Sequence, residues 1–182
     1  MGVRNTDKEY GSIAKFFHWT AAILIIALLL VGWLMHQAGP SIKGTIYNTH
    51  KLVGLFILAM TVPRLIWAFL GIKPKLPNAM NPWEKVAERI VHFGLYLSLF
   101  LMPLFGWAMS TAAGRAPRIF DTSIALPGII QSKPLAHFCS SLHTFFAWVI
   151  VALITLHVGA ALKHHFINKD NVLLTMMPRK KR

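Results

Sequence analysis

Cysteine is almost missing from this 182-residue sequence, in which Cys139 is the single example. One cysteine excludes a disulfide within the chain, and it also excludes the C-x-x-C-H motif through which a cofactor is attached covalently. Any cofactor must therefore be held by coordination and packing. The sequence also shows no acid/base triad, no phosphate-binding loop and no Cys/His spacing typical of zinc.

Acidic residues are scarce as well, with six Asp and Glu against 19 Lys and Arg, which gives a net charge of +13. A nucleic-acid-binding protein would carry its basic residues in a stripe within solvated polar sequence. Here the basic residues gather at the ends of apolar runs, so no nucleic-acid partner is expected. Because 55% of the residues are apolar and only 14% are charged, much of the chain needs membrane lipid as its solvent.

Four apolar runs each contain about the 20 residues that cross a hydrocarbon core of roughly 30 Å. They predict an all-α integral membrane protein, a four-helix transmembrane bundle that forms a single domain over residues 1–182. The expected helices span about 16–36, 50–70, 88–110 and 137–165, and a cytoplasmic C-terminal tail follows over 166–182. Pro63 and Pro103 lie inside runs, where membrane helices tolerate proline as a kink.

Basic residues also predict the orientation, since cytoplasmic segments of membrane proteins carry an excess of Lys and Arg. An even number of crossings places both termini on one side. Fourteen of the 19 Lys and Arg residues fall on that side, including the ending Arg179-Lys180-Lys181-Arg182, and five fall on the other. Both termini are therefore expected to face the cytoplasm.

Histidines within apolar helices are costly, and they usually face a bundle interior. His143 and His157 are 14 residues apart in the fourth run, so they differ by about 40° in azimuth and about 21 Å along the helix. This spacing suits two haems stacked across a bilayer, each held between imidazoles of two helices. By depth, the expected pairs are His18 with His157 and His50 with His143.

Other histidines leave alternatives open, because an intramembrane histidine is often a hydrogen-bonded packing residue. His92 lies at the depth of His18 and is able to replace it as a ligand, although a contact at the haem edge is the favoured interpretation. His36 is on the same helix face as His18 but lies at the edge of a loop, so it is expected to contact water. His137 falls on the face opposite His143 and is expected to reach water.

Several short motifs resemble one known family over nearly the whole chain. They are His18-Trp19, His50 in a helix that ends in Arg64-Leu65, the His143 to His157 spacing, Lys163-His164-His165-Phe166, Lys169-Asp170-Asn171 and Met176-Met177-Pro178-Arg179-Lys180. The sequence thus resembles the bacterial di-haem cytochrome b561 family. The resemblance implies two haem b groups on His18, His50, His143 and His157, and a multi-pass protein of the bacterial inner membrane. Some members oxidise superoxide outside and pass the electron to ubiquinone.

Further residues are candidates for the surroundings of the haems. Arg64 follows His50 by 14 residues, so it is expected near a haem propionate or a quinone at the cytoplasmic end, unless it only extends to the interface. His164 is a second quinone-site candidate, with a basic interfacial anchor as the alternative. On the outer side, Lys51, Arg115 and Arg118 are candidates for attracting a small anionic electron donor.

Three functions follow from these residues. The first is a superoxide:ubiquinone oxidoreductase that moves electrons from an outer to an inner haem. The second is a cytochrome b subunit that transfers electrons for a partner dehydrogenase. The third is a haem-free metal transporter that uses the histidines as metal ligands.

Overall fold

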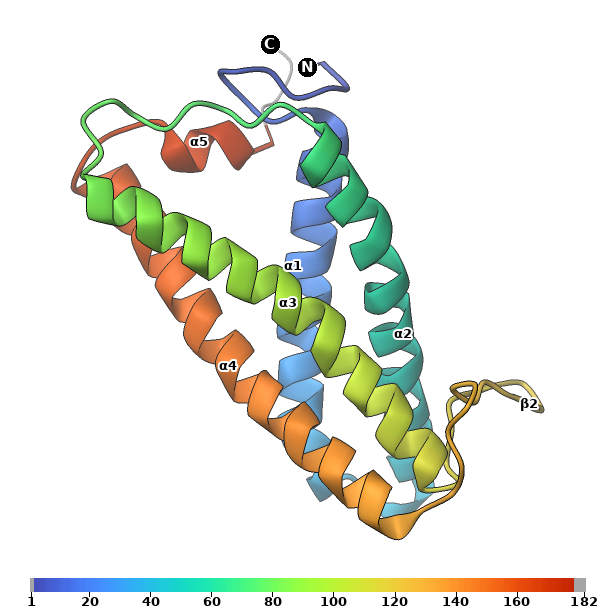
Figure 1. Ribbon diagram of the computed structural model, residues 1–182. Coiled ribbons are helices and arrows are strands. Elements are labelled where there is room, and N and C mark those ends of the chain that lie inside the picture. The colour runs from blue at the N-terminus through green and yellow to red at the C-terminus, as the bar shows by residue number, and fades with distance from the viewer. Residues whose placement is uncertain (1, 179–182) are drawn as a thin grey trace.

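The computed structural model describes residues 2–178, and four long helices account for most of them (Figure 1). All four are long and apolar enough to cross a membrane, which confirms the expected all-α transmembrane bundle. Their bounds are α1 Ser12–Leu34, continued by the 3-10 turn η1 Met35–Gln37, α2 Pro40–Leu70, α3 Pro82–Ala112 and α4 Lys133–Phe166.

The helices extend beyond the apolar runs, because polar residues at their ends carry the start signals. α3 begins after a capping box in which Asn81 and Glu84 bond reciprocally, and the Ser132 side chain accepts a hydrogen bond at the start of α4. α2 begins with Pro40 in its first turn. The expectation that His50 opens the second helix was wrong, since His50 lies ten residues inside α2.

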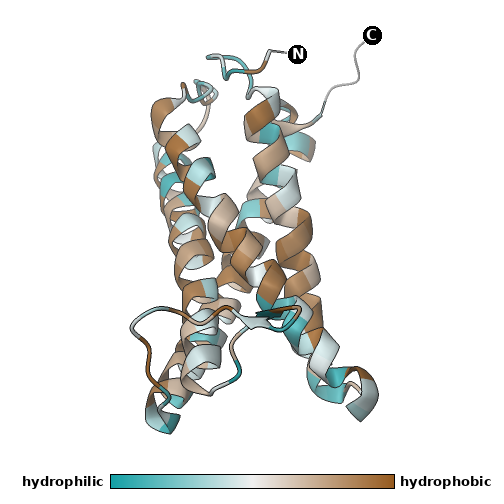
Figure 2. Cartoon of the chain, turned by 90° about the vertical axis from the view of Figure 1, so that its right-hand side faces the viewer, coloured by the Kyte–Doolittle hydropathy of each residue, from teal (hydrophilic) through white to brown (hydrophobic). Residues whose placement is uncertain are grey.

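Packing joins the helices through a small core. α3 and α4 lie side by side along most of their length, α2 lies against α3, and α1 lies against α2. The buried cluster draws on all four helices and consists of Ala21, Ile25, Ile57, Leu99 and Ile150. Many large apolar side chains of the four helices are exposed, and lipid is expected to be the solvent there. Figure 2 shows the apolar residues of the helices in brown.

The N-terminal segment 2–11 and the short helix α5 (Val172–Met176) cover one end of the bundle, which we call the terminal end (Figure 1). The Tyr10 amide donates to the Thr175 carbonyl (3.3 Å), and the Trp19 indole donates to the Met176 carbonyl (3.0 Å). Hydropathy predicts only a tail over 166–182, so the helix α5 is a correction. The basic ending Arg179–Arg182 lies outside the described residues.

At the opposite end, which we call the hairpin end, the segment between α3 and α4 forms a small antiparallel hairpin, β1 (Arg118–Ile119) and β2 (Thr122–Ser123). The Asn48 side chain on α2 holds it by accepting from the Arg118 amide and donating to the Arg118 carbonyl, both at 2.8 Å. The hairpin was not expected, because its turn, Phe120-Asp121, lacks glycine.

Gly94 lies at a close contact between α3 and α4. A Cβ added there would lie 3.0 Å from Leu153 Cδ1, whereas a Cβ added to Gly159 would meet nothing within 4 Å. Gly94→Val should therefore lower the free energy of unfolding in detergent by about 1–3 kcal/mol through overpacking. The matched change Gly159→Val should have little effect. Equal loss in both variants, measured by SDS titration, would contradict a tight α3–α4 crossing at Gly94.

Candidate functional site

Two pairs of imidazoles lie inside the bundle, one near each end of α4. The ring centroids of His18 and His157 are 6.0 Å apart, and those of His50 and His143 are 6.3 Å apart. Two imidazoles on opposite sides of one metal ion, each bonded at about 2 Å, place their centroids roughly 6 Å apart. Both pairs therefore have the separation that one iron between them requires.

The hairpin-end pair is also in a suitable protonation state. His143 Nδ1 lies 2.8 Å from the Met102 carbonyl oxygen, which only accepts hydrogen bonds, so Nδ1 carries the hydrogen. In the neutral ring this leaves Nε2 free to bind a metal. His50 Nδ1 is buried and has no hydrogen-bond partner among the described residues. A buried nitrogen without a partner is unusual, and its ring is therefore suited to a ligand from outside the chain.

Glycines leave room for both rings of this pair. A Cβ on Gly106 would lie 2.9 Å from two atoms of the His143 ring, and a Cβ on Gly32 would lie 3.4 Å from His50 Cε1. Any larger residue at position 106 would push His143 away from the Met102 carbonyl. The backbone of α3 thus fixes the orientation of this imidazole.

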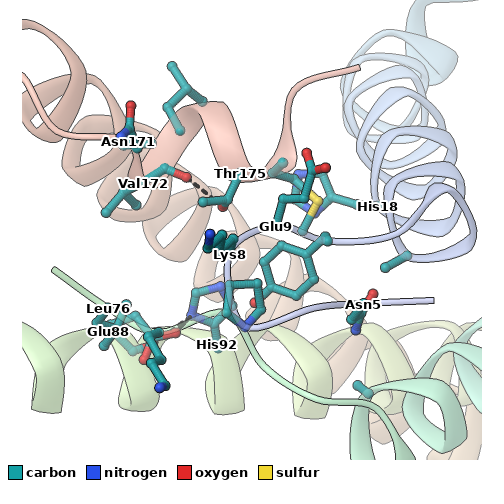
Figure 3. Close-up of a pocket in the computed structure, with 18 of the residues that line it drawn as sticks. Asn5, Lys8, Glu9, His18, Leu76, Glu88, His92, Asn171, Val172 and Thr175 are labelled. Carbon is teal, nitrogen blue, oxygen red and sulfur yellow. Dashed lines mark hydrogen bonds and ion pairs between the residues drawn. The ribbon is translucent and has the colours of Figure 1, made fainter. Parts of the chain in front are cut away.

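The terminal-end pair opens into a cavity of about 810 Å³. Its walls come from the N-terminal segment, all four long helices, the α2–α3 loop and the tail that contains α5 (Figure 3). His18, His92 and His157 line the inner part. Lys8 and Asn5, from the covering segment, line the outer part. This volume is in the range of cofactor sites, and the mixture of apolar walls and a polar rim suits a group that carries carboxylates at one edge.

Arg64 lies beside His18 within this cavity. Its Nη2 is 3.5 Å from His18 Nδ1, and its guanidinium lies over the Tyr96 ring at 5.2 Å. A guanidinium only donates, so this contact makes His18 Nδ1 an acceptor. A metal on His18 Nε2 requires the hydrogen on Nδ1 instead. The contact and the ligand role therefore exclude each other, and a metal bound to His18 would leave Arg64 free to donate to an anion in the cavity.

His92 is close to this pair, as its depth predicts. Its ring is 5.1 Å from the His157 ring and perpendicular to it. His92 Nδ1 contacts both the Glu88 carbonyl (2.8 Å) and Glu88 Oε1 (3.0 Å), so Nδ1 carries the hydrogen and Nε2 is free. The separation to His157 is shorter than one shared metal ion requires, and on this ground His18 fits the partner role better.

Two further polar groups of the cavity wall were not identified from the sequence. Trp67 Nε1 is a buried donor with no partner among the described residues. Burial, then the charge of Glu88, then Tyr96 raise the pKa of Tyr10 above its usual value, so its phenol stays protonated. Neither residue forms a recognisable motif, and only the folded chain brings them to the cavity.

His164 does not line the cavity. Its side chain is buried, and Nδ1 lies 2.5 Å from Asp170 Oδ2, while Asp170 Oδ1 accepts from the Val172 amide at the start of α5. These contacts fasten α5 to the end of α4. Neighbouring Lys163 pairs instead with Glu84 of α3. The geometry favours a structural role for His164 over a direct contact with a quinone.

The cationic candidates of the hairpin end do lie together. Lys51 Nζ donates to the Arg115 carbonyl (2.6 Å), which ties α2 to the loop after α3. The Arg118 guanidinium donates to the Asp121 carbonyl (3.2 Å) and is exposed. These three residues, Lys51, Arg115 and Arg118, form what we call the cationic cluster.

The remaining histidines have ordinary surroundings. His36 Nδ1 lies 3.0 Å from the Tyr47 hydroxyl at an exposed position, and His137 is exposed. Within residues 2–178, no group of three or more His, Cys, Asp and Glu side chains is arranged to hold a metal ion.

Comparison with known proteins finds a family model and relatives that match nearly the whole chain. The family model described as prokaryotic cytochrome b561 matches residues 9–179. The chain is 32% identical to cytochrome b561 homolog 2 of Escherichia coli, over 97% of this chain and 95% of that protein. It is 30% identical to cytochrome b561 homolog 1 of the same organism, over 91% and 95%. It is 27% identical to a probable superoxide oxidase, CybB, of Yersinia pestis, over 96% and 98%.

The His164 contact generates a prediction about the tail. His164→Ala removes a buried partner of a carboxylate, a loss of roughly 1–3 kcal/mol, which should release α5 from α4. Amide hydrogen exchange at residues 172–176 should accelerate in this variant and in Asp170→Ala. His165→Ala is the control, since that ring lies beside its neighbour Phe166, with 4.8 Å between the ring centroids. Unchanged exchange in both test variants would show that α5 is held by other contacts.

Proposed function

The chain belongs to the prokaryotic cytochrome b561 family of membrane electron-transfer proteins with haem b, and we propose that it oxidises superoxide at the hairpin end and reduces ubiquinone at the terminal end. The observation that carries the proposal is the presence of two imidazole pairs at two levels of α4, each at the separation that one iron requires. Electron transfer across a membrane needs a redox centre near each face.

We assign the two haems to four residues, His50 and His143 at the hairpin end and His18 and His157 at the terminal end. His143 and His157 are 14 residues apart, which is about 21 Å along α4. Bound haems supply one-electron redox couples at the two depths. The chain would supply the ligand nitrogens, and it fixes the His143 ring against Gly106.

At the hairpin end, the electron donor that fits is a small anion. Lys51, Arg115 and Arg118 lie together where the positive-inside rule predicts few cations, and such a cluster raises the local concentration of anions. Superoxide gives up one electron and leaves as dioxygen, so no proton donor is required. The similarity to a probable superoxide oxidase supports this choice.

At the terminal end, two superoxide ions supply the two electrons that turn one ubiquinone into ubiquinol, and two protons must arrive as well. The cavity contains groups that hold or pass protons, namely the hydrogen-bonded pair of His92 and Glu88 and the phenol of Tyr10. Arg64 and Lys8 are placed to bind anionic groups such as haem propionates. The positive-inside count orients this end toward the cytoplasm of a bacterial inner membrane.

The assignment predicts about two haems per chain by pyridine haemochrome analysis. His143→Ala and His18→Ala should each keep about one, with different reduced-minus-oxidised spectra, because each variant loses a different axial ligand. His92→Ala should keep about two. If His92→Ala loses a haem and His18→Ala does not, His92 rather than His18 is the partner of His157. A wild-type value near one would refute the arrangement of two centres.

The cationic cluster predicts the salt dependence of the superoxide reaction. Reversing Arg115 and Arg118 to Glu changes the local charge by about four units, so the rate of quinone reduction by superoxide should fall. The wild-type rate should also fall as salt screens exposed charges, over about 10 Å at 0.1 M. The control reverses Lys73 and Lys85 at the terminal end and should leave the rate unchanged.

A wild type that reduces quinone only with an added dehydrogenase would favour the alternative function, a cytochrome b subunit that serves a partner dehydrogenase.

A further inference from the structure

The turn of the hairpin presents apolar side chains to the outside of the molecule. Phe120 is 96% exposed and adjacent Ile119 is 48% exposed. Phe120 also has a φ of +50°, in the left-handed region that bulky residues rarely adopt and that glycine or asparagine occupies without strain. Since the ring contacts almost nothing within residues 2–178, the described chain gains no packing in return for this conformation.

The level of the hairpin along the bundle follows from its contacts with α2. The apolar part of α2, residues 52–70, is about 28 Å long, close to the thickness of a hydrocarbon core. Asn48 and Lys51, which bind the Arg118 and Arg115 backbones, come just before this part. The attachment points therefore lie one to four residues, roughly 2–6 Å, beyond the hydrocarbon edge.

The hairpin is not at the extreme end of the molecule. α2 continues for eight residues beyond Asn48 to Pro40, which is about 12 Å of helix. Figure 1 shows the hairpin extending sideways from the bundle, above the lowest turns of the helices, and Figure 2 shows it in front of the helices when that side faces the viewer. Its tip thus extends over the membrane surrounding the bundle, at the depth of the lipid headgroups.

We propose that the β1–β2 hairpin is an interfacial membrane anchor, with Phe120 inserted at the boundary between headgroups and acyl chains of the membrane that the helices span. Aromatic rings concentrate at this depth in membrane proteins. The exposed guanidinium of Arg118, beside the ring in sequence, suits the phosphate groups at the same level. The proposal does not depend on the electron donor or acceptor.

Anchoring would have a direct consequence for the cationic cluster. Arg115 and Arg118 belong to the same segment as Phe120, and their backbones are bound to α2. With α2 holding one side of the segment and lipid holding its tip, both cations stay at the membrane surface beside the hairpin-end histidines.

The single native cysteine allows a depth measurement in the full-length haem-loaded protein. In a Cys139→Ser background, a nitroxide spin label is attached to Phe120→Cys, in nanodiscs of phosphatidylethanolamine and phosphatidylglycerol. Oxygen concentrates in lipid, whereas a nickel chelate stays in water, so their collision rates with the label report depth. Matched labels at Lys43→Cys, exposed and beyond the hairpin on α2, and at Phe56→Cys, exposed within the apolar part of α2, supply the water and lipid references.

The ratio of oxygen to nickel collision rates at position 120 should be several-fold above that at position 43 and below that at position 56. A second pair of variants carries the label at Ser123→Cys, one with native Phe120 and one with Phe120→Asp. The aspartate should increase nickel access at position 123, because the tip then leaves the interface. A ratio at position 120 equal to that at position 43, or no response at position 123, would overturn the anchor. If the ratios at positions 120 and 43 are equal, the Phe120 ring lies in water, where a protein partner would be the alternative occupant.

Discussion

An imidazole inside a lipid-embedded bundle has no water to satisfy its nitrogens, so it needs a hydrogen-bond acceptor on one nitrogen and a partner on the other. His143 meets the first requirement through the Met102 carbonyl and leaves its second nitrogen facing the space toward His50. The rest of the bundle follows from this constraint. Gly106 must be small for the ring to fit, α3 must lie close to α4, and α2 must place His50 at matching depth.

At the terminal end, the nitrogens of the buried imidazoles have different surroundings. There the second pair opens into a cavity that segments from both ends of the chain cover, and polar groups line its rim. Arg64 donates to His18 Nδ1, the ring nitrogen that would have to carry a hydrogen if His18 bound a metal through Nε2. The two ends therefore differ in a way that suits two tasks: a compact site near a cationic surface, and a roomier site with groups that exchange protons.

The sequence predicted the helices and the depth of the histidines because both depend on periodicity and hydropathy. His143 and His157 share a face from their spacing alone, and the structure places them opposite His50 and His18 as expected. Helix starts were placed too late, since Pro40, Asn81 and Ser132 act through local capping that hydropathy ignores. The partnership of His164 with Asp170 depends on how the chain turns after α4, and no helical period describes it.

The hydrogen bonds that link the N-terminal segment to α5 also carry information about biogenesis. The Tyr10 amide and the Trp19 indole bind carbonyls of Thr175 and Met176, near the end of the described chain. A ribosome makes these partners after all four long helices, long after the first helix has entered the bilayer. The covered cavity is therefore completed only after α5 has been synthesised, whereas the contact between Asn48 and the hairpin is available earlier. A cofactor can therefore enter the terminal-end cavity during the interval in which the helices are already inserted and the cavity is not yet covered.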